Sequence, residues 1–243
     1  MISLGCPRTL VDSELYLGRL KQAGFQVVDA VEGSETVIIN TCSFIQESIK
    51  ESIDTILQAV KLKQAGKLKA VVVAGCLVQR FKEELIKELP DVDGFVGVDG
   101  FGDIETVVQR ALQGDHPQSL RPRPQVPHRG VRARSALTPS HYAYLKISEG
   151  CLKGCSFCVI PKIKGPLSSR PIDAVLEEAK QLVEERGVKE SEVIASIRQG
   201  DAEPARAGRG MYRKTFEFGR VWRGRQYPLK QVAVVVADRK SVV

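Results

Sequence analysis

The sequence has 243 residues, 43% of them hydrophobic, and a formal net charge of +7. No run of about 18 apolar residues exists, which argues against a membrane-spanning helix, and the start lacks the basic and apolar segments of a signal peptide. The sequence therefore predicts a cytoplasmic protein, in which six cysteines act as metal ligands or reactive thiols rather than as disulfides.

The first 113 residues alternate short apolar runs with amphipathic segments. The apolar runs predict strands at 1–4, 36–40, 69–75 and 94–98. Apolar residues that recur every three or four positions predict helices at 45–60, 81–89 and 103–112. Thr9 with Asp12, and Ser43 with Gln46, have the spacing of capping boxes and predict two helix starts. This alternation predicts an α/β domain with a parallel sheet over residues 1–113.

Three cysteines follow the predicted strands of this domain. Cys6 comes after the first strand, Cys42 after the second and Cys76 after the third. Because the carboxyl ends of parallel strands share one edge, where ligands bind, we expect these cysteines to converge there. The alternative is that they are three small buried hydrophobic residues, as free cysteines often are.

Residues 114–141 are rich in proline and arginine and lack periodicity, so they are predicted to form a linker. After the linker, 142–148 is a predicted strand, 171–187 a predicted helix and 191–197 the next predicted strand. The sequence thus predicts a second α/β domain that starts within 142–197.

Residues 198–243 form a predicted basic tail, with 11 Lys+Arg and 4 Asp+Glu, which accounts for the whole net charge. Few aromatic residues are interleaved with these charges, so direct nucleic-acid binding is not expected. Only 231–237 has strand character, and we expect it to find no partner.

The loop "SEGCLKGCSFCVIP" (148–161) places Cys151, Cys155 and Cys158 within eight positions. A tetrahedral zinc or a fully ligated iron–sulfur cluster takes four protein ligands. Either a fourth ligand comes from elsewhere, or one metal position is open. Three histidines of the linker are candidates for a zinc site, although none has zinc-finger spacing from the cysteines: His116, His128 and His141.

Taken together, the segments "SLGCPRTLVDSE" (3–14), "NTCSFIQESIKESI" (40–53), "AGCLVQRF" (74–81) and "YAYLKISEGC" (142–151) and the CxxxCxxC loop resemble the radical S-adenosylmethionine methylthiotransferase family. Within it they are similar to the RimO branch, which modifies an aspartate of a small-subunit ribosomal protein. The resemblance covers about residues 1–193. It implies an N-terminal parallel-sheet domain followed by the first βα units of an incomplete TIM-type barrel.

The resemblance also implies roles for individual residues. Cys151, Cys155 and Cys158 would hold a [4Fe–4S] cluster whose open iron chelates S-adenosylmethionine, which is cleaved to a 5′-deoxyadenosyl radical. A second [4Fe–4S] cluster, with an open iron for the inserted sulfur, would be held by the other three cysteines: Cys6, Cys42 and Cys76. Phe157 corresponds to an aromatic residue that packs by the adenine, and its alternative role is that of a core aromatic. No residue is assigned to catalysis.

Three hypotheses follow. The first is ribosomal-protein aspartate methylthiotransfer with two [4Fe–4S] clusters and S-adenosylmethionine, and a ribosomal protein as partner. The second is the transfer-RNA-modifying sister activity, which "CPRTLVDSE" (6–14) disfavours. The third is a truncated, non-catalytic iron–sulfur-binding fragment, because the likeness ends near residue 193 and the expected barrel strands do not follow.

Overall fold

The structure is a computed structural model, and it describes residues 1–121, 133–139, 142–153, 155–185 and 232–236. They fall into two compact units. The first contains the described parts of 1–126, 133–135 and 149–168, and the second those of 136–148 and 169–243. None of the helices in these parts of the chain is both long and apolar enough to cross a membrane.

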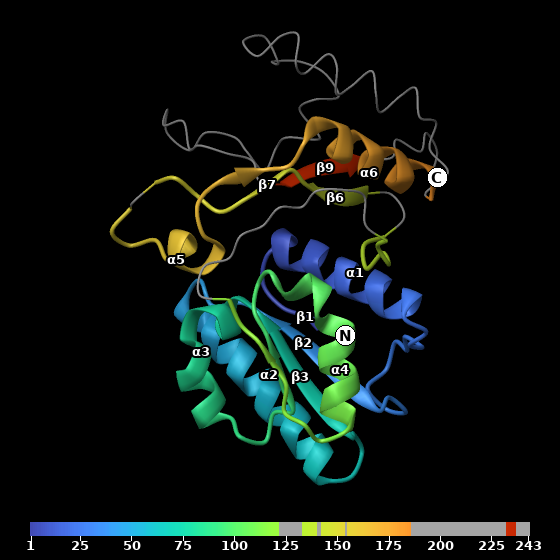
Figure 1. The fold of residues 1–243 in the computed structure, drawn as a ribbon, viewed down its shortest axis with the longest axis vertical. Coiled ribbons are helices and arrows are strands. Elements are labelled where there is room, and N and C mark those ends of the chain that lie inside the picture. The colour runs from blue at the N-terminus through green and yellow to red at the C-terminus, as the bar shows by residue number, and fades with distance from the viewer. Residues whose placement is uncertain (122–132, 140–141, 154, 186–231, 237–243) are drawn as a thin grey trace, which may run out of the picture. The chain divides into compact units, whose positions relative to one another are not determined.

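A five-stranded parallel sheet forms the centre of the first unit (Figure 1). Its strands lie side by side in the order β1 (Ile2–Ser3), β2 (Thr36–Thr41), β3 (Ala70–Gly75), β4 (Gly94–Val96) and β5 (Gln118–Ser119). The prediction of an α/β domain with a parallel sheet is therefore confirmed, and so are all four of its predicted strands. The fifth strand, β5, lies within the predicted linker and has only two residues, too few to leave a periodic pattern.

Helices cover both faces of this sheet: α1 (Pro7–Gln22), α2 (Gln46–Gln64), α3 (Cys76–Glu88) and α4 (Ile104–Leu112), with a short 3₁₀ turn, η1 (Gly100–Gly102). Alternate residues of β3 point to opposite faces. Val71 and Val73 pack with α2 and α3 in one buried cluster. Val72 faces the other way, toward Val107 of α4, and α1 packs against α4 on that side (Figure 1).

The two predicted capping boxes are wrong. Helix α1 begins at Pro7, with Cys6 as its N-cap residue, and Thr9 lies inside the helix. Proline at the first helical position carries the dihedral angle that a helix needs and starts it early. Helix α2 begins at Gln46 after Ile45, and neither helix has a side-chain cap hydrogen bond.

The second unit contains β6 (Tyr142–Lys146), α6 (Ile172–Glu184) and β9 (Val232–Val236). Residues of β6 and α6 share a small core of Ala143, Leu145, Ala179 and Leu182. The predicted strand in 142–148 and helix in 171–187 are confirmed, whereas the predicted strand 191–197 lies outside the described residues. The incomplete barrel stays a prediction.

The expectation that the strand in 231–237 has no partner is wrong. Strand β9 pairs with β6 in antiparallel register, from Tyr142 opposite Val236 to Lys146 opposite Val232. An uncovered strand edge presents unpaired N–H and C=O groups, and β9 supplies partners for those of β6. The remainder of the predicted tail lies outside the described residues.

Candidate functional site

Three cysteines lie just beyond the carboxyl ends of neighbouring parallel strands, as predicted. Strand β1 ends three residues before Cys6, β2 ends directly before Cys42, and β3 ends directly before Cys76. Cys6 is also the N-cap residue of α1, and Cys76 is the first residue of α3. The structure therefore brings the three residues to one edge of the sheet. That they bind metal there stays a prediction.

Close backbone contacts draw this edge together. Gly5 has a φ of 92°, and a Cβ atom there would lie 2.5 Å from Cβ and 2.9 Å from Sγ of Cys42. The loop that carries Cys6 thus runs directly against Cys42. Gly75 has a φ of 96°, and its absent side chain leaves room for Asn40, whose Oδ1 would be 2.3 Å from a Cβ atom. Both glycines let neighbouring chain segments approach more closely than a larger residue allows.

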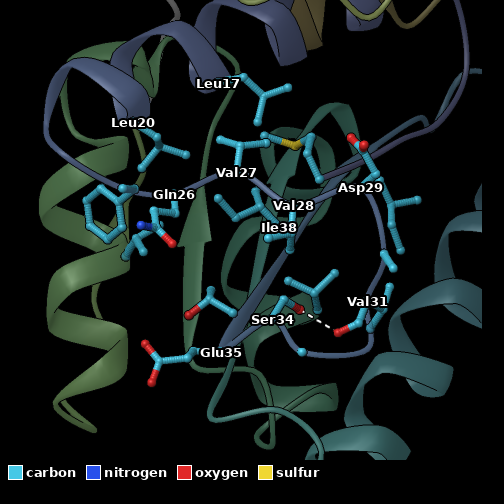
Figure 2. Close-up of a pocket in the computed structure, with 18 of the residues that line it drawn as sticks. Leu17, Leu20, Gln26, Val27, Val28, Asp29, Val31, Ser34, Glu35 and Ile38 are labelled. Atoms are coloured by element: carbon cyan, nitrogen blue, oxygen red, sulfur yellow. Dashed lines mark hydrogen bonds between the residues drawn. The ribbon is translucent and has the colours of Figure 1, made fainter.

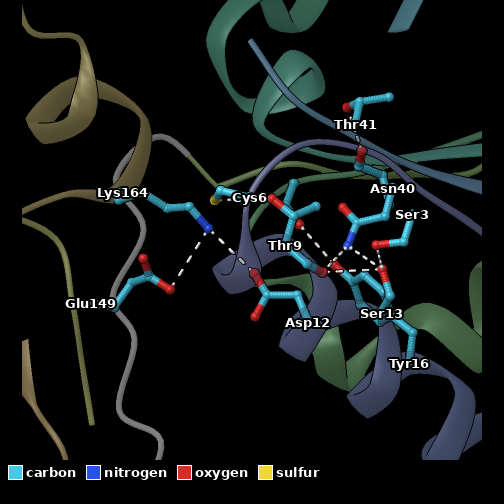
Figure 3. Close-up of polar contacts among 12 residues, drawn as sticks. Ser3, Cys6, Thr9, Asp12, Ser13, Tyr16, Asn40, Thr41, Glu149 and Lys164 are labelled. Carbon is cyan, nitrogen blue, oxygen red and sulfur yellow. Dashed lines mark hydrogen bonds and ion pairs between the residues drawn. The ribbon is translucent and has the colours of Figure 1, made fainter. Parts of the chain in front are cut away.

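A buried polar network fixes β1, β2 and the first turns of α1 (Figure 3). Asn40 Nδ2 donates to the carbonyl oxygen of Thr9 at 3.0 Å and to Ser13 Oγ at 2.9 Å. Ser13 Oγ is 2.8 Å from Ser3 Oγ. Thr9 Oγ1 lies 3.6 Å from Cys6 Sγ. The network therefore extends from the centre of the sheet to the first cysteine.

Hydroxyl groups also hold the backbone on either side of Cys42 and Cys76. The Cys42 N–H donates to Ser52 Oγ at 3.2 Å, and Ser52 Oγ donates to the Cys42 carbonyl at 2.9 Å. Thr41 Oγ1 donates to the Ala74 carbonyl at 2.6 Å and accepts from the Leu77 N–H at 3.3 Å. Each cysteine thus stands on a backbone that a buried hydroxyl group keeps in place.

The surroundings of Cys6 and Cys76 shift their pKa values in opposite directions. Burial alone would raise the pKa of Cys6, but hydrogen bonds with Thr9 and the positive charge of Arg8 outweigh it and lower the pKa below its ordinary value. Burial raises the pKa of Cys76 to about 11, against the opposing charge of Lys164, and Cys42 and Cys6 add to the rise. These electrostatic couplings are a second sign that the three thiols are neighbours.

The three-cysteine loop belongs to the same compact unit. Within this unit the segment 149–168 begins with the last residue of β7 (Ser148–Glu149), contains α5 (Ile160–Lys164) and ends with the first residue of β8 (Ser168–Ser169), and α5 packs against α3. The Cys151 N–H donates to the Gly165 carbonyl at 3.2 Å, and the Cys158 N–H donates to the Cys155 carbonyl at 3.1 Å. The Cys155 side chain is exposed and the other two are half-buried.

Phe157, between the last two cysteines of this loop, is 86% exposed. It is therefore not a core aromatic residue in this structure. Its predicted contact with adenine stays a prediction, and an exposed ring next to the cysteines is free to accept such a contact.

All six cysteines are free of disulfide bonds. Among the described residues, no three Cys, His, Asp or Glu side chains are close enough to surround one metal ion. A [4Fe–4S] cluster makes a different demand, because each thiolate binds a separate iron. His116 Nδ1 lies 3.2 Å from the Val92 carbonyl, next to the amino end of β4 and away from the cysteine edge. His128 and His141 lie outside the described residues.

Charged side chains for which the sequence predicted no role at this edge are buried next to it. Lys164 Nζ is 3.4 Å from Asp12 Oδ2 and 3.7 Å from Glu149 Oε2 (Figure 3). Arg8 is electrostatically coupled to Cys6, Glu149 and Cys76. Lys164 and Asp12 are 152 positions apart in the chain, so no local sequence pattern could have paired them.

A cavity of about 530 Å³ lies elsewhere in the first unit (Figure 2). Its lining is largely apolar, with Leu17, Leu20, Val28 and Ile38 among the residues that face it. Met1 and Thr36 also line it, which places it at the amino ends of β1 and β2. It contains no cysteine and is remote from the cysteine edge.

Comparison with known proteins relates both parts of this site to one family. Residues 1–97 match the family model described as "Uncharacterized protein family UPF0004". Over 194 residues the chain is 48% identical to the ribosomal protein uS12 methylthiotransferase RimO of Bdellovibrio bacteriovorus. It is 42% identical over 195 residues to proteins of the same name from Pelotomaculum thermopropionicum and Myxococcus xanthus.

These matches cover 80% of this chain in each case, but only 42%, 44% and 40% of the three relatives. The chain thus spans less than half the length of the curated relatives that it matches. The matched length is sufficient to contain all six cysteines.

Proposed function

We propose that this chain, which belongs to the family of the RimO methylthiotransferases, transfers a methylthio group to an aspartate of the small-subunit ribosomal protein uS12. The observation that carries the proposal is the presence, in one compact unit, of three cysteines at the carboxyl edge of the sheet and of the three-cysteine loop. The similarity to ribosomal protein uS12 methylthiotransferases supports the substrate.

We propose that Cys6, Cys42 and Cys76 bind one [4Fe–4S] cluster, and that the loop cysteines bind a second: Cys151, Cys155 and Cys158. The donor chemistry fits, because thiolates are the usual ligands of such clusters and none of these cysteines is engaged in a disulfide. When bound, the clusters supply an electron for the cleavage of S-adenosylmethionine and an iron site for the sulfur that is transferred.

The chain's own residues prepare these thiols for ligation. Cys6, with its lowered pKa, gives up its proton readily, whereas Cys76 keeps its proton until a metal displaces it. Ser52 and the Asn40 network keep the backbone of the edge in place, so the thiols need not be ordered at the moment of binding. Phe157 offers its exposed ring to the adenine of S-adenosylmethionine.

The experiment uses the 243-residue chain, reconstituted anaerobically with iron and sulfide and supplied with S-adenosylmethionine, a chemical reductant and purified uS12. Peptide mass spectrometry is expected to find one methylthio group on an aspartate of uS12, and none with the Cys155→Ala variant. Modification of a transfer-RNA adenosine in its place would contradict the substrate assignment. Cluster binding without any turnover would support the alternative of a non-catalytic fragment.

A further inference from the structure

The segment that carries the three-cysteine loop is bound to α1 by a buried charged cluster. Lys164 is the last residue of α5. Asp12 lies on α1, and Glu149 lies on β7, at the other end of the segment. The side chains of Lys164, Asp12 and Glu149 are 4%, 7% and 3% exposed. Lys164 Nζ lies between the two carboxylates, at 3.4 Å and 3.7 Å (Figure 3).

The lysine keeps its charge in this position. Burial would lower the pKa of Lys164, but the charges of Glu149, Cys76 and Asp12 outweigh it and raise the pKa above its ordinary value. Withdrawing charges from water costs several kcal/mol per ion, so such a cluster contributes little net stability. The cluster is better explained by the arrangement that it enforces, because removal of one partner leaves the other buried charges with less compensation.

That arrangement joins the two sets of cysteines. Asp12 stands in the helix that begins directly after Cys6, and Lys164 lies six positions beyond Cys158. Helix α5 packs against α3, the helix that begins with Cys76. At the base of the segment, a Cβ atom on Gly150 would lie 2.1 Å from the Pro166 carbonyl oxygen, so the two ends of the segment are tightly apposed.

We infer that Lys164 is a positioning residue, which fixes the three-cysteine segment against the edge that carries Cys6 and Cys76. Its charge attaches the segment to α1 through Asp12 and closes the segment's own base through Glu149. The value of this arrangement for catalysis rests on the proposed function, because sulfur transfer needs both cysteine sets in one reaction site. The attachment itself is a property of the polypeptide and is measurable without metal.

The first test is hydrogen exchange on the metal-free chain. In Lys164→Met, amides of 149–168 should exchange at least about tenfold faster than in the wild type, while the amides of β3 keep their protection. Lys164→Arg retains the charge and should restore most of the protection. The matched control is Lys162→Met, because Lys162 is exposed on the same helix. Unchanged exchange in Lys164→Met, or equal loss in Lys162→Met, would overturn the inference.

A variant that fails to fold would lose protection everywhere, so Asp12→Asn serves as a second variant that keeps the lysine. It should loosen 149–168 in the same direction as Lys164→Met, and the double variant should loosen it less than the sum of the two. Strict additivity of the two changes would contradict a shared ion pair.

The second test uses the reconstituted chain. Removing a buried cation disfavours the gain of an electron nearby, so Lys164→Met should lower the midpoint potential of the cluster assigned to Cys76 more than that of the loop cluster. A purely structural role would leave both potentials unchanged in the molecules that still fold. If the chain binds no clusters, the proposed function fails, whereas the exchange result still decides the role of Lys164.

Discussion

At Gly5 the chain passes so close to Cys42 that no side chain fits. Replacement by alanine would add a Cβ atom 2.5 Å from Cβ of Cys42, at a φ of 92° that L-residues rarely adopt. We expect Gly5→Ala to lower the free energy of unfolding by about 2–4 kcal/mol and to reduce iron incorporation at this edge. Chemical denaturation and iron analysis measure the two effects.

The matched control is Gly102→Ala. No atom lies within 4 Å of a Cβ at Gly102, so its free energy of unfolding should change by less than about 0.5 kcal/mol. Equal effects at Gly5 and Gly102 would show that the approach to Cys42 is not tight.

The opposite pKa shifts of Cys6 and Cys76 predict different alkylation profiles in the metal-free chain. Only thiolates react, so Cys6, whose pKa is lowered, should be alkylated by iodoacetamide well before Cys76 near neutral pH. The rate at Cys76 should rise about tenfold per pH unit until the pH nears about 11. Mass spectrometry of each peptide gives both rates, and equal rates at about pH 8 would refute the shifts.

The raised pKa of Cys76 also makes the free energy of unfolding depend on pH. Because the folded-state pKa of Cys76, about 11, exceeds the ordinary value of 9.0, the folded protein holds this proton more tightly than the unfolded chain does. The resulting stabilisation is complete below about pH 9 and should be lost as the pH rises from there toward 11.

Sequence reasoning found the cysteines but not the groups that position them. Thiols at the ends of apolar β-branched runs, and three cysteines in eight positions, form local patterns that are visible in a single sequence. Lys164, Asp12 and Glu149 form no such pattern as a group, because a lysine and two carboxylates spread over 152 positions resemble ordinary surface charges until the chain is folded. The role of Ser52 was not predictable either, because in the sequence it is one polar residue among others in a predicted helix.

Helix α2 holds the backbone of Cys42 in place through Ser52. Its Oγ satisfies both the N–H and the carbonyl of Cys42 within a fully buried setting. In Ser52→Ala both backbone groups lose their partner, so we expect a loss of about 1–3 kcal/mol in the free energy of unfolding, measured by urea denaturation.

Thr55→Ala is the control on the same helix. Thr55 Oγ1 donates at 2.7 Å to the Glu51 carbonyl in an exposed position, so its removal should change stability by no more than about 0.5 kcal/mol. If Thr55→Ala lowers the free energy of unfolding as much as Ser52→Ala does, the hydrogen bonds between Ser52 and Cys42 have no special role.

Element types were predictable where the pattern was long, and element ends were not. Strands β2 and β3 were found because each contains a run of apolar β-branched residues, at 37–39 and at 71–73, that fills the middle of a sheet. The predicted start of α1 at the Thr9 capping box was wrong because Pro7, a residue that favours the first helical position, begins the helix earlier. The pairing of β9 with β6 was missed because it joins residues about 90 positions apart, and no local signal encodes such a contact.

Both sets of cysteines lie in the first compact unit of the molecule. The sheet contributes Cys6, Cys42 and Cys76 at one edge, and the segment 149–168 contributes the others. The central claim is that these are two separate cluster sites, each with three ligands. It predicts that loss of one set leaves the other intact.

The most direct measurement is the iron and sulfide content, with Mössbauer spectra, of the anaerobically reconstituted chain and of two variants, Cys155→Ala and Cys42→Ala. The wild type should hold two [4Fe–4S] clusters, or about eight irons per chain, and each variant about four, with the remaining cluster unchanged. A single zinc per chain without charge-transfer absorption, or the loss of all iron in either variant, would contradict two independent sites.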